Sequence, residues 1–249
     1  MTVRARIGAV YPDDIWVDQL IEEVMSDWQA FLPEEVELVS AHHHHPNVDC
    51  NVEISIKIIE SDEVEEAARR LVRYKRPDCI VYMCTTTSFV RGLGYDKEIS
   101  DRIQKATGVP AVSTSTSVIE AFRALGLRKI ALTSVYLPDV QQRLLEFMAG
   151  HGIEVVSHKS LNLARYHSHN PPERLREAVE RADSPEADGV FISGTGQRTA
   201  GFLADLEEKL GKPVVSANQA SMWHALQLVG LEPRLPGKGK LLSGAFRVG

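Results

Sequence analysis

Asp78-Cys-Ile-Val-Tyr-Met-Cys84-Thr85 is a short apolar run that ends in a cysteine and opens onto a turn of hydroxyl residues. A second run, Asp188-Gly-Val-Phe-Ile-Ser-Gly194-Thr195, aligns with it 110 positions later. Downstream, Gly108-Val-Pro-Ala-Val-Ser113 and Gly211-Lys-Pro-Val-Val-Ser216 align 103 positions apart. A long repeat with two copies indicates duplicated α/β units rather than a solenoid. The alternative is that two unrelated β-loop-α units share one pattern of apolar and turn residues.

The rest of the chain alternates short β-branched runs with longer amphipathic segments, which is typical of parallel sheets covered by helices. The pattern predicts strands near 4–10, 35–41, 79–83, 109–112, 129–134, 153–157, 189–193 and 213–216. It predicts helices over 15–31, 62–75, 96–106, 117–126, 138–151, 172–182, 199–210 and 219–228. Residues 52–59 (VEISIKII) alternate in polarity and read as another strand or a loop.

The two aligned runs also predict where a ligand binds. Ligands of open parallel sheets bind at the carboxyl ends of the strands. Cys84-Thr85-Thr86-Thr87-Ser88 and Gly194-Thr195-Gly196 each follow a strand directly. We therefore expect these two segments to line one cleft from opposite sides.

Composition excludes several classes of protein. The chain has 249 residues, of which 43% are hydrophobic and 25% charged, so it is long and apolar enough to bury a core. A net charge of −6 argues against a nucleic-acid surface, which needs a basic face. No stretch approaches the ~18 apolar residues of a membrane span, and the N-terminus reads as a first strand rather than a signal peptide. With three cysteines, too few for a disulfide framework, the sequence predicts a cytoplasmic protein.

Cys84 and Tyr136 are the candidate catalytic residues. Backbone N–H groups and hydroxyls in the turn after Cys84 would hold an anion and lower the thiol pKa, giving a nucleophile or a proton donor. The alternative for Cys84 is a buried, inert thiol. Cys79 lies inside the strand and reads as core, and Cys50 has no supporting residues around it. Tyr136 follows strand 129–134, where its phenol would donate to a carboxylate or simply pack.

Other motifs are weaker. His42 to His45 follow a strand and are expected in a loop near the cleft mouth. Four consecutive histidines cannot all face one metal, and no metal-ligand spacing accompanies them, so we expect no metal site. The chain contains no dinucleotide fingerprint, P-loop or G-x-S-x-G elbow.

The sequence resembles the maleate isomerase and arylmalonate decarboxylase branch of the Asp/Glu racemase superfamily. The resemblance covers nearly the whole chain and is strongest in Cys84-Thr-Thr-Thr-Ser-Phe-Val-Arg-Gly92, Ala106-Thr-Gly-Val-Pro110, Ala121-Phe-Arg-Ala-Leu-Gly126, Leu206-Glu-Glu-Lys-Leu-Gly-Lys-Pro-Val214 and Ser216-Ala-Asn-Gln-Ala-Ser-Met-Trp223. It implies two pseudo-symmetric, flavodoxin-like α/β halves with the active site in the cleft between them and no cofactor. We expect one half to comprise residues 1–115 plus 219–249, and the other 116–218.

The resemblance also assigns roles. Thr85, Thr86 and Tyr136 match the donors that hold a substrate carboxylate. Gly194, Thr195 and Gly196 match the anion-binding turn of the second half, and Arg198 matches an arginine of the isomerases. Isomerases carry a cysteine in both halves, and the decarboxylases carry one in the second half alone. Here Cys84 fills the first position and Gly194 the second.

Two departures put the substrate in question. Pro12-Asp13-Asp14-Ile15 replaces the isomerases' Pro-Ser-Ser-Asn run, and Leu161–Asn170 lacks their Asp-Asn pair. The resemblance implies a small carboxylate substrate and is compatible with a homo-oligomer. We expect an isomerase of an unsaturated dicarboxylate, in which the thiolate adds to the alkene. The alternatives are a decarboxylase in which Cys84 protonates an enediolate, and a non-catalytic carboxylate-binding or accessory protein.

Overall fold

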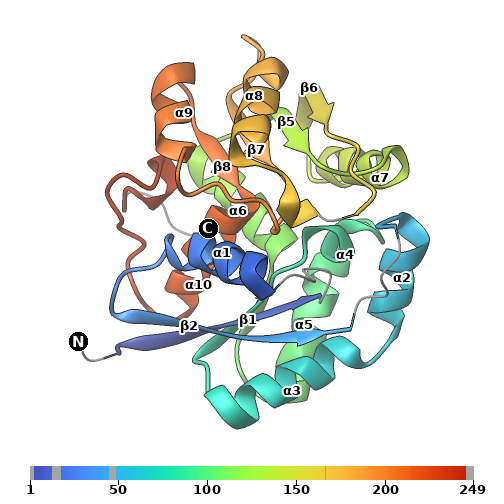
Figure 1. Ribbon diagram of the computed structural model, residues 1–249, viewed down its shortest axis with the longest axis vertical. Coiled ribbons are helices and arrows are strands. Elements are labelled where there is room, and N and C mark those ends of the chain that lie inside the picture. Colours follow the sequence, from blue (N-terminus) through green and yellow to red (C-terminus); the bar gives the residue numbers. More distant parts are fainter. Residues whose placement is uncertain (1–2, 13–17, 45–48, 166, 245–249) are drawn as a thin grey trace.

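The computed structural model describes residues 3–12, 18–44, 49–165 and 167–244, with only the backbone described for residues 18–20. Its strands form two parallel four-stranded sheets with the same pattern of connections (Figure 1). The first sheet has the order β2-β1-β3-β4 and the second the order β6-β5-β7-β8. The strands are β1 (Ala5–Pro12), β2 (Val36–His43), β3 (Cys79–Tyr82), β4 (Ala111–Ser113), β5 (Lys129–Ser134), β6 (Glu154–Ser160), β7 (Gly189–Ile192) and β8 (Val214–Ser216). The predicted α/β fold with two equivalent parallel sheets is confirmed.

Helices follow most strands and cover the sheets. They are α1 (Asp18–Gln29), α2 (Val52–Glu60), α3 (Glu63–Lys75), α4 (Thr85–Phe89), α5 (Tyr95–Thr107), α6 (Thr114–Leu125), α7 (Pro138–Gly150), α8 (Pro172–Ala182), α9 (Leu203–Leu210) and α10 (Ala217–Leu228). Two short 3₁₀ turns are η1 (His167–His169) and η2 (Lys240–Leu242). Within the described part of the chain, every helix is too short or too polar to span a bilayer.

The aligned residues of the two runs form the same hydrogen bonds and helix caps in both halves. The Asp78 carboxylate accepts from the Arg6 N–H at 2.8 Å, and the Asp188 carboxylate accepts from the Lys129 N–H at 2.9 Å. Each aspartate thus ties the start of its strand to the start of the central strand of its sheet. Ser113 and Ser216 each end a strand and cap the next helix, α6 or α10, by accepting a first-turn backbone N–H. The sequence repeat is therefore a structural repeat.

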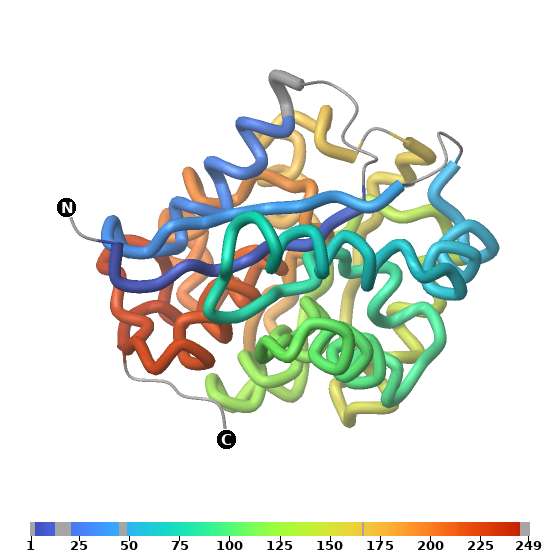
Figure 2. The backbone as a smooth tube through the Cα atoms, turned by 90° about the horizontal axis from the view of Figure 1, so that it is seen from below, coloured from blue at the N-terminus to red at the C-terminus, as the bar shows by residue number. Residues whose placement is uncertain are grey.

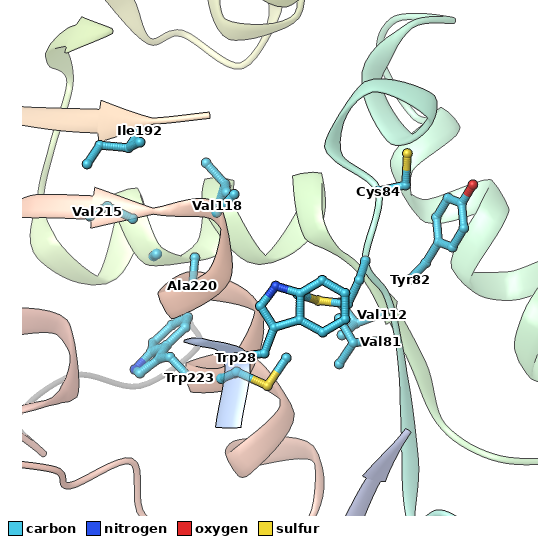
Figure 3. Packing of buried hydrophobic residues seen from close by; sticks show 14 of the residues in the cluster. Trp28, Val81, Tyr82, Cys84, Val112, Val118, Ile192, Val215, Ala220 and Trp223 are labelled. Atoms are coloured by element: carbon cyan, nitrogen blue, oxygen red, sulfur yellow. The ribbon is translucent and has the colours of Figure 1, made fainter. Parts of the chain in front are cut away.

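The two repeated helices join the halves. Helix α6 packs against α10, and residues 217–226 of α10 are all buried, polar residues included. Val118 of α6, Ala220 and Trp223 of α10 and Trp28 of α1 lie in one apolar cluster between the sheets (Figure 3). Because this cluster is continuous with both sheets, the strand ends of the two halves are held in fixed relation.

Three sequence predictions need correction. Residues 52–59 form helix α2 instead of a strand or loop: Asn51 caps it by accepting the Ile54 N–H at 2.9 Å, and the buried side chains of Ser55, Ile58 and Ile59 follow helical spacing. His42 and His43 belong to strand β2, which runs beside β1 (Figure 2), rather than to a loop, and His45 lies outside the described residues. The short helix α4 after Cys84 was not predicted, because five residues are too few to show a helical period.

Candidate active site

The two aligned strand ends meet at one small cavity of about 50 Å³. The first half contributes Tyr11, Pro12 and residues 83–86 to its lining; the second half contributes Tyr136, His167, Ser168 and residues 194–196. The predicted placement of Cys84, Thr85 and Thr86 opposite Gly194, Thr195 and Gly196 is confirmed. The Asp13, Asp14 and Ile15 departure from the isomerase pattern lies outside the described residues.

Cys84 occupies the point where β3 becomes α4. Its backbone is extended (φ −144°, ψ 104°) and it is the N-cap residue of α4. Its side chain lines the cavity and is 8% exposed, so the thiol is within reach of a bound ligand but shielded from bulk water. Tyr82 lies two residues earlier, and Figure 3 shows its hydroxyl and the Cys84 sulfur projecting to the same side. Burial raises the pKa of Tyr82, and the electrostatic interaction of its hydroxyl with the Cys84 side chain contributes to that rise.

A cluster of hydroxyls surrounds the second catalytic candidate. The Tyr136 hydroxyl lies 3.0 Å from Ser193 Oγ and also interacts with the hydroxyls of Thr86 and Thr85. Burial raises the pKa of Tyr136 to about 12, and the neighbouring hydroxyls of Ser193, Thr86 and Thr85 oppose that rise only in part. The phenol therefore stays protonated at neutral pH and can donate to an anionic oxygen in the cavity.

The turn after β7 is tied to the first half. Trp28 Nε1 donates to the Thr195 carbonyl at 2.9 Å, and the Thr195 hydroxyl donates to the Met83 carbonyl at 3.0 Å. That hydroxyl proton is directed at protein, so Thr195 presents its oxygen rather than a donor to the cavity. Gly194 has a φ of +118°, a conformation that glycine takes far more easily than other residues.

Arg198 lies outside this cavity. Its guanidinium pairs with Glu23 of α1, and the residue lines a different depression with Asp27 and Arg176. Asp27, also on α1, accepts the backbone N–H groups of Thr199 and Ala200, both at 2.7 Å. Helix α1 therefore draws the segment after Gly196 toward itself. Arg198 therefore does not line this cavity, and its role in substrate binding stays a prediction.

The remaining cysteines are placed as the sequence predicts. Cys79 is fully buried in β3, and burial raises its thiol pKa to about 12, so it is unreactive at neutral pH. Cys50 is partly buried and does not line the cavity.

Sequence reasoning missed five cavity residues: Met83, Tyr11, Pro12, His167 and Ser168. Tyr11 and Pro12 end strand β1, so the strand-end rule applied to 79–83 would have found them. His167 and Ser168 come from η1, beyond β6, and no spacing in the sequence marks them. His167 Nε2 lies 3.0 Å from the Leu163 carbonyl, which fixes the imidazole at the cavity wall.

The donor types at the cavity are those that bind an anion by hydrogen bonds. They are a thiol, hydroxyls, an imidazole and backbone amides, with neither Lys nor Arg among the described lining residues. Among the residues that the structure describes, no group of three or more His, Cys, Asp or Glu side chains is placed to hold a metal ion. Such a site can hold a carboxylate or enediolate by hydrogen bonds while the thiol attacks or protonates carbon.

Comparisons with known proteins agree with this geometry. The family model described as arylmalonate decarboxylase matches residues 57–242. The chain is 34% identical over 191 residues to the arylmalonate decarboxylase of Bordetella bronchiseptica, covering 74% of this chain and 78% of that protein. It is 28% identical to the maleate isomerase of Pseudomonas putida, covering 99% of this chain and 100% of the other.

A solved structure is also similar across the whole fold. It is a liganded double mutant of arylmalonate decarboxylase in which one glycine is changed to cysteine and one cysteine to serine. The match has a TM-score of 0.84 and 29% identity, covering 96% of this chain and 99% of that one. From the family model, which spans most of the chain, and from the relatives that share its two-sheet fold, we conclude that the chain belongs to the arylmalonate decarboxylase family.

Proposed function

We propose that this protein is a cysteine-dependent, cofactor-independent cis-trans isomerase of a small unsaturated dicarboxylate. The observation that carries the proposal is the pairing of one thiol, Cys84, with a cluster of hydroxyl donors in a cavity of about 50 Å³. Gly194 occupies the equivalent position on the other side, so the chemistry has to proceed with a single thiol at the two strand ends.

The mechanism needs one covalent intermediate. The Cys84 thiolate forms a C–S bond with one alkene carbon, and the π electrons move onto the carbon that bears the adjacent carboxylate. The resulting enediolate oxygens accept hydrogen bonds from the Tyr136, Thr86 and Thr85 hydroxyls. The former C=C bond is now a single bond, and the two carboxylate-bearing carbons rotate about it. The C–S bond then breaks, the double bond re-forms, and the trans alkene and the Cys84 thiolate are released. No net proton transfer to carbon occurs.

The runner-up function is decarboxylation of a substituted malonate. It is favoured by the relative at 34% identity and by the solved double mutant, whose gained and lost cysteines parallel Cys84 and Gly194. In this reaction the C–CO₂ bond breaks and its electron pair forms an enediolate. The Cys84 S–H then delivers its proton to carbon from one face only. Both reactions use the same donors, so the product has to decide between them.

Deuterium incorporation separates the two reactions. We would incubate maleate and an α-substituted malonate separately in D₂O with the full-length protein and follow both by NMR, with Cys84→Ser as the control. Fumarate without carbon-bound deuterium supports the isomerase. A chiral acid carrying one deuterium, formed with loss of CO₂, refutes it and supports the decarboxylase. Inertness toward both contradicts both reactions on these substrates and favours a carboxylate-binding protein.

Two further expectations follow from the same site. Three cysteines are too few for a disulfide framework, which supports a reducing compartment and hence the proposed cytoplasmic location. We also propose that residues 1–115 plus 219–249 and residues 116–218 act as the two halves that close on the substrate.

A further inference from the structure

A buried histidine from the His42–His45 run lies behind the catalytic thiol. His43 is 1% exposed, although it belongs to a polar run on an edge strand. Its ring stacks on Tyr82 with a centroid distance of 5.9 Å, and its Nε2 lies 3.3 Å from the Tyr82 hydroxyl. Tyr82 is itself fully buried, and its hydroxyl projects to the same side as the Cys84 sulfur, with which it interacts (Figure 3). Cys84, Tyr82 and His43 thus form a continuous chain of polar groups.

The pleat of the sheet produces this alignment. Val10 of β1 pairs with Ala41 on one side and with Tyr82 on the other, so these three side chains share one face. His43 lies two residues beyond Ala41, and Cys84 two residues beyond Tyr82, which places both on that same face. The order β2-β1-β3 brings the histidine and the thiol to the same carboxyl edge.

We propose that Tyr82 and His43 form a relay that takes the proton from the Cys84 thiol and holds it on the imidazole, leaving a thiolate hydrogen-bonded to Tyr82. The inference rests on the proposed function of Cys84 as the reacting group. The S–H bond of Cys84 breaks as its proton forms a new O–H bond on Tyr82. The original Tyr82 O–H bond breaks as its proton forms an N–H bond on His43 Nε2. The reverse transfer reloads the thiol after it has protonated a substrate.

The hydrogen-bond partners satisfy both ends of the transfer. Thr87 Oγ1 donates to the Tyr82 oxygen at 2.8 Å, which fixes one of that oxygen's two acceptor positions in either state. Before transfer, Tyr82 accepts from the thiol and donates to His43; afterwards it accepts from His43 and donates to the thiolate. His43 Nδ1 lies 3.2 Å from the His44 carbonyl, which can hold an N–H on that nitrogen throughout. Burial raises the pKa of Tyr82 well above its usual range, so Tyr82 passes a proton on without remaining a phenolate.

Charged and titratable groups face the relay from several elements. Tyr136 and Cys84 interact across the cavity, which His167 of η1 also lines. Tyr95 of α5 faces Tyr82. On the outer side, His43 lines a polar depression with its neighbours His42 and His44 and with Glu63, Glu66 and Arg70 of α3. The two carboxylates favour an imidazolium there and Arg70 opposes it. This depression is also separate from the substrate cavity, so the stored proton has a second side from which to exchange.

The test measures thiol reactivity without any substrate. Wild type, Tyr82→Phe, His43→Gln and the control Tyr95→Phe are treated with iodoacetamide from pH 5.5 to 10, and Cys84 alkylation is followed by peptide mass spectrometry. Tyr95→Phe also removes one buried hydroxyl, but that hydroxyl accepts from Arg102 at 3.1 Å and belongs to no relay. We expect Tyr82→Phe to slow Cys84 alkylation at pH 7 on the order of tenfold or more, because a thiolate loses a charge-assisted hydrogen bond. The pH of half-maximal rate should move upward.

His43→Gln should shift the profile in the same direction, since Tyr82 then has no imidazole to receive its proton, and Tyr95→Phe should leave it unchanged. Profiles of Tyr82→Phe and His43→Gln that overlay the wild type would overturn the relay, as would an equal shift in Tyr95→Phe. If Tyr82→Phe fails to fold by circular dichroism, His43→Gln decides alone. If the Tyr82→Phe and His43→Gln variants shift the alkylation profile but the wild-type protein turns over neither maleate nor a malonate, the relay is supported and the proposed function is refuted. If the wild type turns over maleate but the alkylation profiles of the variants are unchanged, the proposed function is supported and the relay is refuted.

Discussion

Cys84 and Gly194 stand at the same place in two copies of one unit. Each follows a buried strand that is preceded by an aspartate whose carboxylate accepts a backbone N–H of the neighbouring strand. Both residues line the same cavity. Their backbones differ: Cys84 is extended at φ −144°, whereas Gly194 lies at φ +118°. Duplication has therefore preserved the scaffold while the reactive group remains in one half. The second half has a backbone that suits glycine, so a thiol cannot be added there without strain.

Of the variants that test the difference between Cys84 and Gly194, removal of the Cys84 thiol should have the largest effect on turnover. Cys84→Ala leaves a cavity without any thiol at either strand end, and we expect turnover to fall on the order of 10³-fold or more. The matched variant Cys79→Ala removes the same group five residues earlier, inside the core, and should lose about 1 kcal/mol of stability while keeping its activity. Steady-state rates and urea unfolding of both variants check this. Normal turnover by Cys84→Ala would contradict the thiol mechanism.

The second expected effect concerns the donor that the second half contributes. Tyr136→Phe removes a buried hydroxyl that serves the enediolate, and kcat should fall roughly 10²-fold, the scale for one oxyanion donor. Tyr95→Phe removes an equally buried hydroxyl away from the cavity and should leave kcat within about twofold. A change below about threefold in Tyr136→Phe would assign that side chain to packing.

The repeated helices differ in one titratable group. His224 of α10 occupies the position that Ala121 holds in α6. Burial lowers the pKa of His224 from 6.5 to about 4, so the neutral form is bound in the fold. Its contribution to stability is present above pH 6.5 and is lost as pH falls toward 4, and by linkage it amounts to roughly 3 kcal/mol.

His224→Gln should therefore flatten the fall in unfolding free energy between pH 6.5 and 4 relative to wild type. Burial raises the pKa of Asp27, which has the opposite sign, but that contribution is common to both proteins and cancels in their difference. Urea titrations at half-unit pH intervals measure the two curves. Parallel curves would show that His224 does not titrate over this interval.

The smallest effect tests the glycine itself. An alanine Cβ at Gly194 would lie 3.4 Å from Gln197 Cγ and 3.8 Å from the Tyr136 hydroxyl, which is ordinary contact, so the cost comes from the positive φ. We expect Gly194→Ala to lose about 1–2 kcal/mol of unfolding free energy. Gly196→Ala, whose Cβ would lie 3.6 Å from the Ser168 nitrogen and which has no positive φ, is the matched control and should lose less. Equal losses would remove the conformational argument.

Gly194→Cys carries the same comparison into chemistry. If strain permits the fold, a second thiol faces Cys84 across the cavity, and exchange of the α-hydrogen of a compatible chiral acid should appear, leading to racemisation. Polarimetry and ²H NMR of the recovered acid in D₂O measure it. Retention of optical purity by a folded Gly194→Cys protein would show that the two strand ends do not address opposite faces of one carbon.

The local sequence pattern predicted where the strands lie, but it did not predict which side chains from distant parts of the chain meet. The runs ending at Cys84 and Gly194 are buried on both faces, so their apolar pattern is continuous and their ends are sharp. The strand or loop prediction for residues 52–59 was wrong because their alternating polarity also fits a strand. In the structure, the Asn51 cap and the burial of Ile58 and Ile59 favour a helix. Arg198 followed the family pattern by position, but Glu23, far away in sequence, captures its guanidinium.

The sequence by itself determined the duplication, the parallel α/β fold, and the position of one reactive cysteine at a strand end. These depend on the order of apolar, glycine and capping residues along the chain, which acts over a few positions. Only the tertiary structure decided that His167 shares a cavity with Cys84, and that His43 is buried against Tyr82. Such contacts join residues tens of positions apart, and they are set by strand order and by the packing of α6 on α10 between the sheets. No local pattern encodes that packing, because its free energy comes from surfaces that meet only after the chain has folded.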